Sequence, residues 1–234
     1  MSTSELRPET AALVERFRLF ALPGGADAVR GARGVRLTQR GEMVRFPGSR
    51  AIPFTAEQTI DALRSGFRWV AAVRAGPVTL MTATDAYGAG RGALVLRAGG
   101  VVPVSRGEGP DFDRGELQRY LAEVVFCPPA LARHPSLEWT AVGPDTARIR
   151  DGAGPGDAAV DVTIDEARGI ITCVADRPRA VGKRSVITPW SAVSDVPREW
   201  SGVRIPTRVA VTWYLPDGPH TYFRCVVTSL ELLR

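Results

Sequence analysis

The chain has 234 residues, 44% of them hydrophobic, which is enough for one domain that buries roughly 70% of the surface of its unfolded chain. Its formal net charge is +5, but Lys183 is the only lysine and the arginines are scattered without a basic run. Non-specific phosphate binding needs several cations on one face, so this composition argues against nucleic acid as a partner. No apolar stretch is long enough to predict a membrane span.

The N-terminal region lacks a secretory signal pattern, because charged residues such as Glu15 and Arg16 interrupt its apolar stretch. We therefore expect the chain to stay in the cytoplasm. The three cysteines show no CxxC spacing, and we expect them to be reduced, structural thiols.

The first predicted element is a helix over residues 9–20, which follows Pro8 and places Leu13, Phe17 and Phe20 on one face. We expect residues 1–33 to form an N-terminal helical segment packed on a single domain of residues 34–234. A strand bent near Gly41 is predicted over 35–46, and a short second helix over 56–64.

From residue 67 the apolar pattern changes to a period of two, which is typical of strands. Four strands are predicted before the centre of the chain and seven after it. Their ranges are 67–73, 78–84, 93–97, 101–104, 136–142, 146–150, 158–164, 170–175, 185–188, 208–215 and 220–229.

Between these two groups lies the clearest element, an amphipathic helix over residues 113–126. Leu117, Tyr120 and Leu121 form its apolar stripe, Asp113 is the predicted cap, and Pro128 cannot continue the helix. The helices do not alternate with the strands, which argues against βαβ units. We therefore predict an α+β, mainly β fold: a strongly bent antiparallel sheet, half-barrel or incomplete barrel, with about three helices covering its concave side.

The chain resembles an uncharacterised bacterial family in a series of spaced signatures over about residues 34–230. The most specific is the helix block Arg119-Tyr-Leu-Ala-Glu123. Further signatures are the strand Val35-x-Leu-x-Gln-x-Gly-x-Met-x-Arg45, the segment Phe54-x-Ala-x-Gln58, the strand Gly66-Phe-x-Trp69, the motif Asp85-x-Tyr87, and Ile205-Pro206 followed by Trp213. The family implies no agreed activity. In architecture the chain is similar to lipoprotein-carrier half-barrels such as LolA, which implies a carrier or sensor of a hydrophobic ligand.

The helix block supplies the candidate catalytic residues Glu123, Arg119 and Tyr120, with Asp85 added from the strand region. A pair such as Arg119 and Glu123, one turn apart, can be a solvated helix flank worth about 0.2–0.5 kcal/mol. Over a pocket, the same residues would place a carboxylate, a cation and a phenol at the rim, where they suit proton transfer. Asp85 can alternatively fix a glycine-rich turn, which lacks the Lys-Ser/Thr end of a phosphate loop.

The candidate substrate-binding residues are Trp69, Tyr87, Arg45, Gln58, Trp190 and Arg177. The strand position of Trp69 favours a place in the core, because tryptophan on a half-buried strand normally packs there. Trp190 is expected in a loop, where it could close over an apolar ligand. Arg177 belongs to a cationic group that includes Lys183, which can also be a solvated hairpin end. The chain has two histidines far apart in sequence, so we predict no metal site, and no cofactor.

The first functional hypothesis is a cofactor-independent enzyme, of isomerase or cyclase type, acting on a hydrophobic polyketide-like or lipid-like substrate. The alternative is a non-catalytic carrier or sensor of a hydrophobic ligand, and a third is a protein-interaction module. We expect a monomer or homodimer whose partner is a hydrophobic small molecule.

Overall fold

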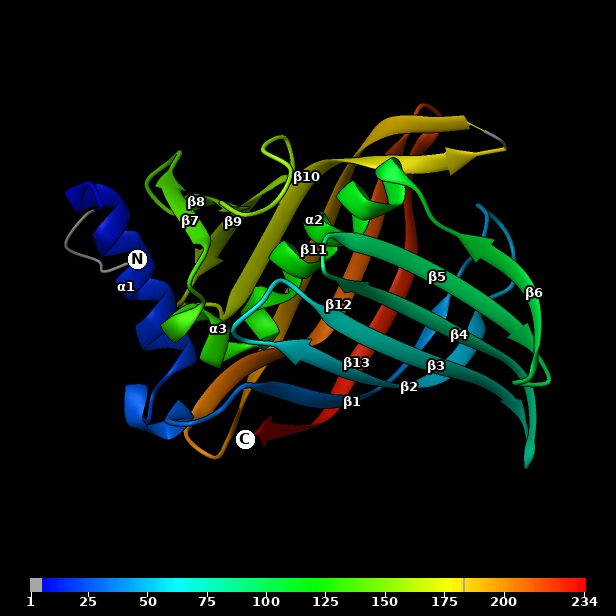
Figure 1. The fold of residues 1–234 in the computed structure, drawn as a ribbon, viewed down its shortest axis with the longest axis horizontal. Helices are drawn as coiled ribbons and strands as arrows, with labels where there is room; N and C mark the ends of the chain where they lie inside the picture. The colour runs from blue at the N-terminus through cyan, green and yellow to red at the C-terminus, as the bar shows by residue number, and fades with distance from the viewer. Residues whose placement is uncertain (1–5, 183) are drawn as a thin grey trace.

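The computed structural model describes residues 6–182 and 184–234, and its central feature is one antiparallel sheet (Figure 1). The sheet has 13 strands in the order β6-β5-β4-β3-β2-β1-β13-β12-β11-β10-β9-β8-β7. The strands are β1 (Gly34–Met43), β2 (Ile52–Asp61), β3 (Phe67–Ala75), β4 (Val78–Gly88), β5 (Arg91–Ala98), β6 (Val102–Gly107), β7 (Leu137–Ala141), β8 (Thr146–Asp151), β9 (Ala159–Asp165), β10 (Ile170–Val181), β11 (Arg184–Trp200), β12 (Val203–Leu215) and β13 (Gly218–Leu233).

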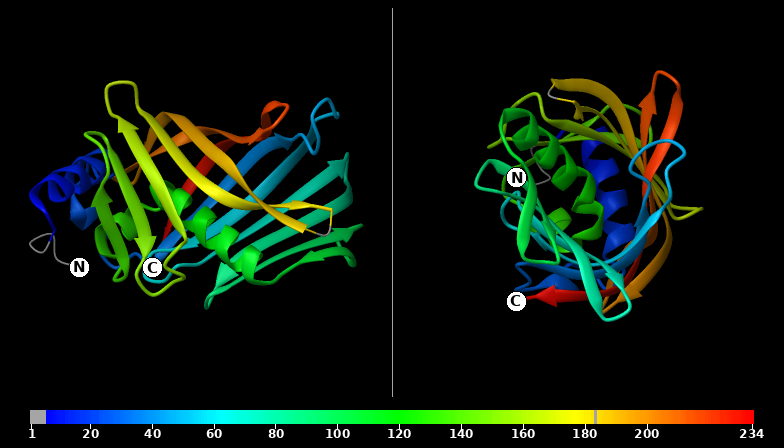
Figure 2. Two further views of the ribbon diagram at one scale, coloured as in Figure 1. Left: turned by 90° about the horizontal axis from the view of Figure 1, so that it is seen from above. Right: turned by 90° about the vertical axis from the view of Figure 1, so that its right-hand side faces the viewer.

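The sheet consists of two meanders that meet at a central seam. Strands β1 to β6 follow one another on one side, β7 to β13 do so on the other, and β1 pairs with β13 from Gly34↔Leu233 to Met43↔Phe223. The sheet curls round strongly, and Figure 2 shows its two meanders facing each other across the interior. The predicted mainly β half-barrel is therefore confirmed.

The helical segments are α1 (Pro8–Ala21), η2 (Ala26–Val29), α2 (Pro110–Glu123), η3 (Val124–Phe126) and α3 (Pro128–Arg133). Helix α2 lies inside the curl, where it contacts β5 and β10 from opposite meanders (Figure 2). Its predicted stripe, Leu117, Tyr120 and Leu121, is fully buried. The approach to β5 is so close that a Cβ at Gly92 would lie 2.8 Å from the carbonyl oxygen of Phe112. This contact requires a glycine at position 92.

Helix α1 covers one end of the half-barrel. Leu13, Phe17 and Phe20 are buried as predicted, and the ring of Phe17 lies 5.7 Å from that of Trp139 on β7. The backbone amide of Ala141 donates to the hydroxyl of Thr10, which fixes the helix to the same strand.

Two predictions about helices are wrong. Residues 56–64 form strand β2 and the turn after it, because inward Phe54, Ala56, Gln58 and Ile60 alternate with outward residues at a period of two. Helix α2 begins at Pro110, so Asp113 lies inside the first turn and does not cap it. The carboxylate of Asp113 instead accepts a hydrogen bond from the amide of Gly92, which holds the helix against β5.

Candidate functional site

The candidate site is a largely buried ionic cluster between α2 and the inner face of the sheet, and its side chains are 12–18% exposed. Arg119 Nη1 lies 2.5 Å from Asp85 Oδ2 on β4, and Arg119 Nε lies 2.9 Å from Glu123 Oε1 one turn along α2. The guanidinium also lies 4.6 Å from the ring centre of Phe67. The structure thus brings together three predicted catalytic residues, and aromatic packing fixes the cation between two carboxylates.

A chain of side-chain hydrogen bonds extends this cluster across β2, β1 and β3. Gln58 donates to Glu123 Oε2 at 2.6 Å, Gln39 donates to Gln58 at 2.8 Å, and the indole of Trp69 donates to Gln39 at 2.8 Å. Both oxygens of Glu123 therefore have a donor. The predicted binding residues Gln58 and Trp69 act here as supports of the cluster, which makes the orientation of Glu123 rigid.

The electrostatics of the cluster follow from its burial. Burial raises the pKa of Asp85, although the adjacent Arg119 works against this shift. Burial alone would lower the pKa of Arg119, but Glu123 and Asp85 outweigh it, so Arg119 stays charged. Glu116, one turn earlier on α2, has a pKa of about 8, raised first by burial and then by Asp85. Glu116 is therefore largely protonated at neutral pH.

A second cation faces α2 from the opposite meander. Arg177 on β10 donates to the carbonyl oxygen of Gly115 at 2.5 Å and lies 4.7 Å from the ring centre of Trp190. The indole of Trp190 donates to the hydroxyl of Tyr222 at 3.3 Å. The prediction of a loop around Trp190 is wrong, because this residue lies within β11 and is 4% exposed. Lys183, predicted beside Arg177, lies outside the described residues.

Three predicted site residues do not join the cluster. The hydroxyl of Tyr120 donates to the carbonyl oxygen of Asp61 at 3.0 Å, so its phenol belongs to the core and does not line a cavity rim. Tyr87 is buried on β4. Arg45 is exposed beyond the end of β1, where its guanidinium lies over the ring of Phe46.

The sequence analysis missed Glu116 and Gln39 as members of the site. A signal for each was present, because Glu116 lies three residues before Arg119 on the same helix. Gln39 is a polar residue at an inward position of an alternating strand, which is unusual without a buried partner.

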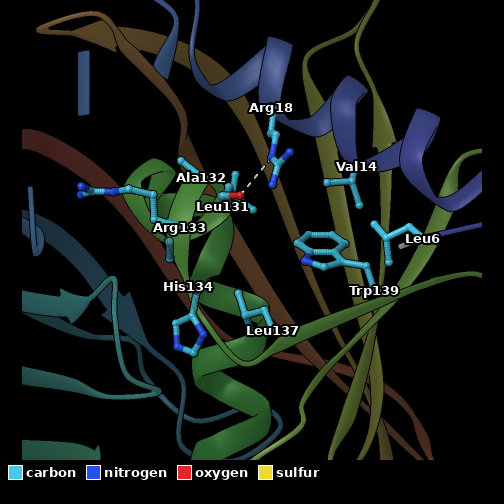
Figure 3. Close-up of a pocket in the computed structure, with 10 residues that line it drawn as sticks. Leu6, Val14, Arg18, Leu131, Ala132, Arg133, His134, Leu137 and Trp139 are labelled. Atoms are coloured by element: carbon cyan, nitrogen blue, oxygen red, sulfur yellow. Dashed lines mark hydrogen bonds between the residues drawn. The ribbon is translucent and has the colours of Figure 1, made fainter. Parts of the chain in front are cut away.

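Hollows also lie elsewhere in the described part of the chain. The first, about 110 Å³ in volume, lies between α1, α3 and β7, where Arg18 donates to the carbonyl oxygen of Leu131 at 3.2 Å (Figure 3). This volume has room for a few waters. The second, about 700 Å³ and open, lies on the convex face of the sheet, where Arg40, Arg208 and Arg224 surround Val193. Neither hollow is lined by a residue of the ionic cluster.

The inner face of the sheet continues beyond α2 as an apolar surface. Directly paired residues of neighbouring antiparallel strands point to the same face of the sheet. Trp69 and Asp85 form such a pair and point inward, so the other residues in their row across the sheet point inward as well. The next two rows toward the β3–β4 hairpin are Ala71↔Ala83↔Leu96 and Val73↔Met81↔Ala98. The row Met43↔Phe223↔Val211 also faces inward, since the ring of Phe223 packs on those of Phe54 and Trp69. We call these rows the inner apolar face.

This face is partly open to solvent. Met81 is 40% exposed, and Val73, Leu96, Met43 and Phe223 are partly exposed. Helix α2 packs on β4, β5 and β8 to β10. It covers the neighbouring row of Trp69, Asp85 and Leu94, where Arg119 pairs with Asp85.

The described residues 6–182 and 184–234 contain no group of three or more His, Cys, Asp or Glu placed to hold a metal ion. No helix in these ranges is long and apolar enough to cross a membrane.

A family model matches residues 12–225, nearly the whole chain, and its description is a family of unknown function, DUF6544. The chain belongs to this family. This confirms the resemblance seen in the sequence signatures, and as a member of DUF6544 the protein inherits no assigned activity. No curated protein sequence matches the chain.

Solved structures with a similar fold share little sequence with this DUF6544 member. A DUF1329 family protein from Desulfovibrio piger matches with a TM-score of 0.50 and 9% identity, over 94% of this chain and 90% of that chain. A LolA superfamily protein from Nitrosomonas europaea matches with a TM-score of 0.46 and 8% identity, over 96% of this chain and 93% of that chain. At 9% identity the match to the DUF1329 structure shows a similar fold and nothing more.

Proposed function

We propose that the protein binds a hydrophobic small molecule on its inner apolar face, as a carrier or sensor. The observation that carries this proposal is the part of that face which α2 leaves uncovered. Partly exposed side chains from both meanders, such as Val73, Leu96 and Phe223, face the same interior. A concave apolar surface of this kind is the usual environment of a buried ligand, and water contact with it is costly.

The ionic cluster supports the polar end of such a site. Asp85 Oδ1 and Glu116 Oε2 are buried and have no hydrogen-bond partner among the described residues. A buried polar atom without a partner costs about 1–3 kcal/mol, so a ligand hydroxyl or amide placed there would gain affinity. The proposal therefore favours an amphipathic ligand with an apolar body and a small polar group.

The test is a matched pair of valine substitutions on opposite faces of the sheet. Val73→Asp places a charge on the inner apolar face, whereas Val193→Asp places it on the convex face. Binding is measured by the fluorescence of a neutral probe, N-phenyl-1-naphthylamine. We expect Val73→Asp to weaken binding about tenfold or more, because a buried charge costs more than 1.4 kcal/mol. Val193→Asp should leave it within twofold. Equal effects of the two substitutions would contradict the proposal.

A second candidate function is catalysis of an isomerisation or cyclisation of the same class of ligand. The observation that favours it is the pair of carboxylates held on Arg119, with Asp85 Oδ1 still free to exchange a proton. Glu123, with both oxygens occupied, would position Arg119. Asp85→Asn that abolishes turnover of a substrate but leaves probe affinity within about threefold would support an enzyme. Equal losses of both would support a carrier.

A further inference from the structure

Most large apolar side chains that are exposed in this protein lie at one end of the half-barrel. Since neighbouring strands are antiparallel, the β1–β2, β3–β4, β5–β6, β10–β11 and β12–β13 connections all lie at that end, on the right and upper right of Figure 1. Val101 is 76% exposed, Phe46 60% and Val78 58%. The same connections and the strand ends beside them expose Ile52, Leu80, Met81, Val102, Val104, Val181, Val186 and Ile187. We call these residues, with the connections that carry them, the rim.

The rim is also strongly cationic. Its arginines are Arg45, Arg50, Arg74, Arg97, Arg179 and Arg184, and none of them forms an ion pair with another described residue. The acids at this end are Asp217 in a connection and Glu42 at a strand end. The opposite end carries arginines too, but Arg91, Arg168 and Arg204 there pair with Asp113, Asp165 and Glu199. The rim therefore combines exposed apolar side chains with arginines that have no acidic partner among the described residues.

We propose that the rim docks onto a membrane surface that contains anionic phospholipids. Apolar side chains at the tips of several hairpins can all enter the headgroup region of one flat bilayer. Adjacent arginines without an ion-pair partner can then bind the lipid phosphates. The inner apolar face runs into the rim without a break, because Val73↔Met81↔Ala98 is followed by Val102 on β6. A ligand could thus pass between this face and the acyl chains without crossing water, which extends the proposed function.

The experiment is sedimentation of the whole protein with vesicles of phosphatidylcholine, with and without phosphatidylglycerol. We expect the protein to sediment with the anionic vesicles and to be released by salt. Phe46→Ser with Val101→Ser, and separately Arg45→Gln with Arg74→Gln, should each lower the bound fraction about tenfold. Leu19→Ser is the matched control, because Leu19 is 65% exposed on α1 at the other end.

Two results would overturn the docking surface. One is a failure of the vesicle assay, in which anionic vesicles bind the rim variants and the Leu19→Ser control equally or bind no protein at all. The other is a dimer in light scattering that Phe46→Ser with Val101→Ser dissociates, since the rim would then contact a second copy of the chain. Val73→Asp separates membrane docking from ligand binding, because this variant should bind the fluorescent probe more weakly and still sediment with vesicles. A rim variant that no longer sediments but still binds the probe would leave the proposal of ligand binding on the inner apolar face standing.

Discussion

Replacing Glu116 by glutamine should make the protein more stable in alkali. The side chain lies in the interior beside Asp85 and Glu123, with Oε2 unpartnered, and its pKa is raised from 4.5 to about 8. Below pH 4.5 the carboxyl is protonated in both the folded and unfolded chain, so its contribution to stability is then fully present. Between pH 4.5 and 8 the unfolded chain loses this proton while the folded chain keeps it, and stability falls.

The size of this loss follows from the shift in pKa. A shift of 3.5 units corresponds to roughly 5 kcal/mol of unfolding free energy by pH 9. Glutamine has nearly the same shape and no charge to bury, so the Glu116→Gln variant should lack this pH dependence. Urea denaturation followed by tryptophan fluorescence, at several values between pH 5 and pH 9, measures the difference between the two proteins.

The control is Glu9→Gln, an exposed glutamate on α1, which should follow the parent chain at every pH. Groups far from Glu116 titrate alike in parent and variant and cancel in the comparison, whereas the adjacent Asp85 shares the pH dependence with Glu116. If Glu116→Gln and the parent lost stability in parallel from pH 5 to pH 9, the carboxyl would be ionised in the folded protein and the reasoning would fail.

Three further predictions concern stability and reactivity. Arg119→Met removes the cation that pairs with Asp85 and Glu123, so it should lower the free energy of unfolding by about 3–5 kcal/mol. A loss below about 1 kcal/mol in urea titration would show instead that water hydrates the two carboxylates. Gly41→Ala should destabilise by about 1–3 kcal/mol in thermal unfolding, because its Cβ would lie 2.8 Å from Cβ of Cys225, whereas Gly88→Ala meets no heavy atom within 4 Å and should change little. The three cysteines are buried and free, with pKa values raised to about 12, so Ellman's reagent at pH 8 should label none until denaturant is added; fast labelling of the native chain would refute this.

Elements with a wide, regular apolar pattern could be predicted from the sequence. Both helices and the mainly β fold could be predicted because their signals come from residues close together in the sequence. These signals are the apolar stripes of α1 and α2 and the two-residue period of most strands. The segment 56–64 was misread because it is short and carries polar Gln58 at an inward position. That glutamine is paired with residues far along the chain, and such pairing leaves no local pattern.

In the candidate site, too, contacts within one helix could be predicted and contacts between distant segments could not. Arg119 and Glu123 could be paired from their spacing on one helix, whereas the contacts to Asp85 and Gln58 join residues that only the sheet order brings together. Tyr120, adjacent in sequence to Arg119, points a different way because successive helical residues are rotated by about 100°. The domain division at residue 33, the cytoplasmic location and the monomer-or-homodimer state stay predictions.

The β1–β13 seam has a consequence for how the chain acquires its structure. Its pairing of Gly34 with Leu233 joins residues from nearly opposite ends of the chain, so the most central junction of the sheet closes last during synthesis. Until then β1 and the unfinished second meander each present an unpaired edge, which is the kind of surface that recruits other chains. Refolding should therefore be slow and should give the best yield in dilute protein, where these edges find each other before they find a neighbour.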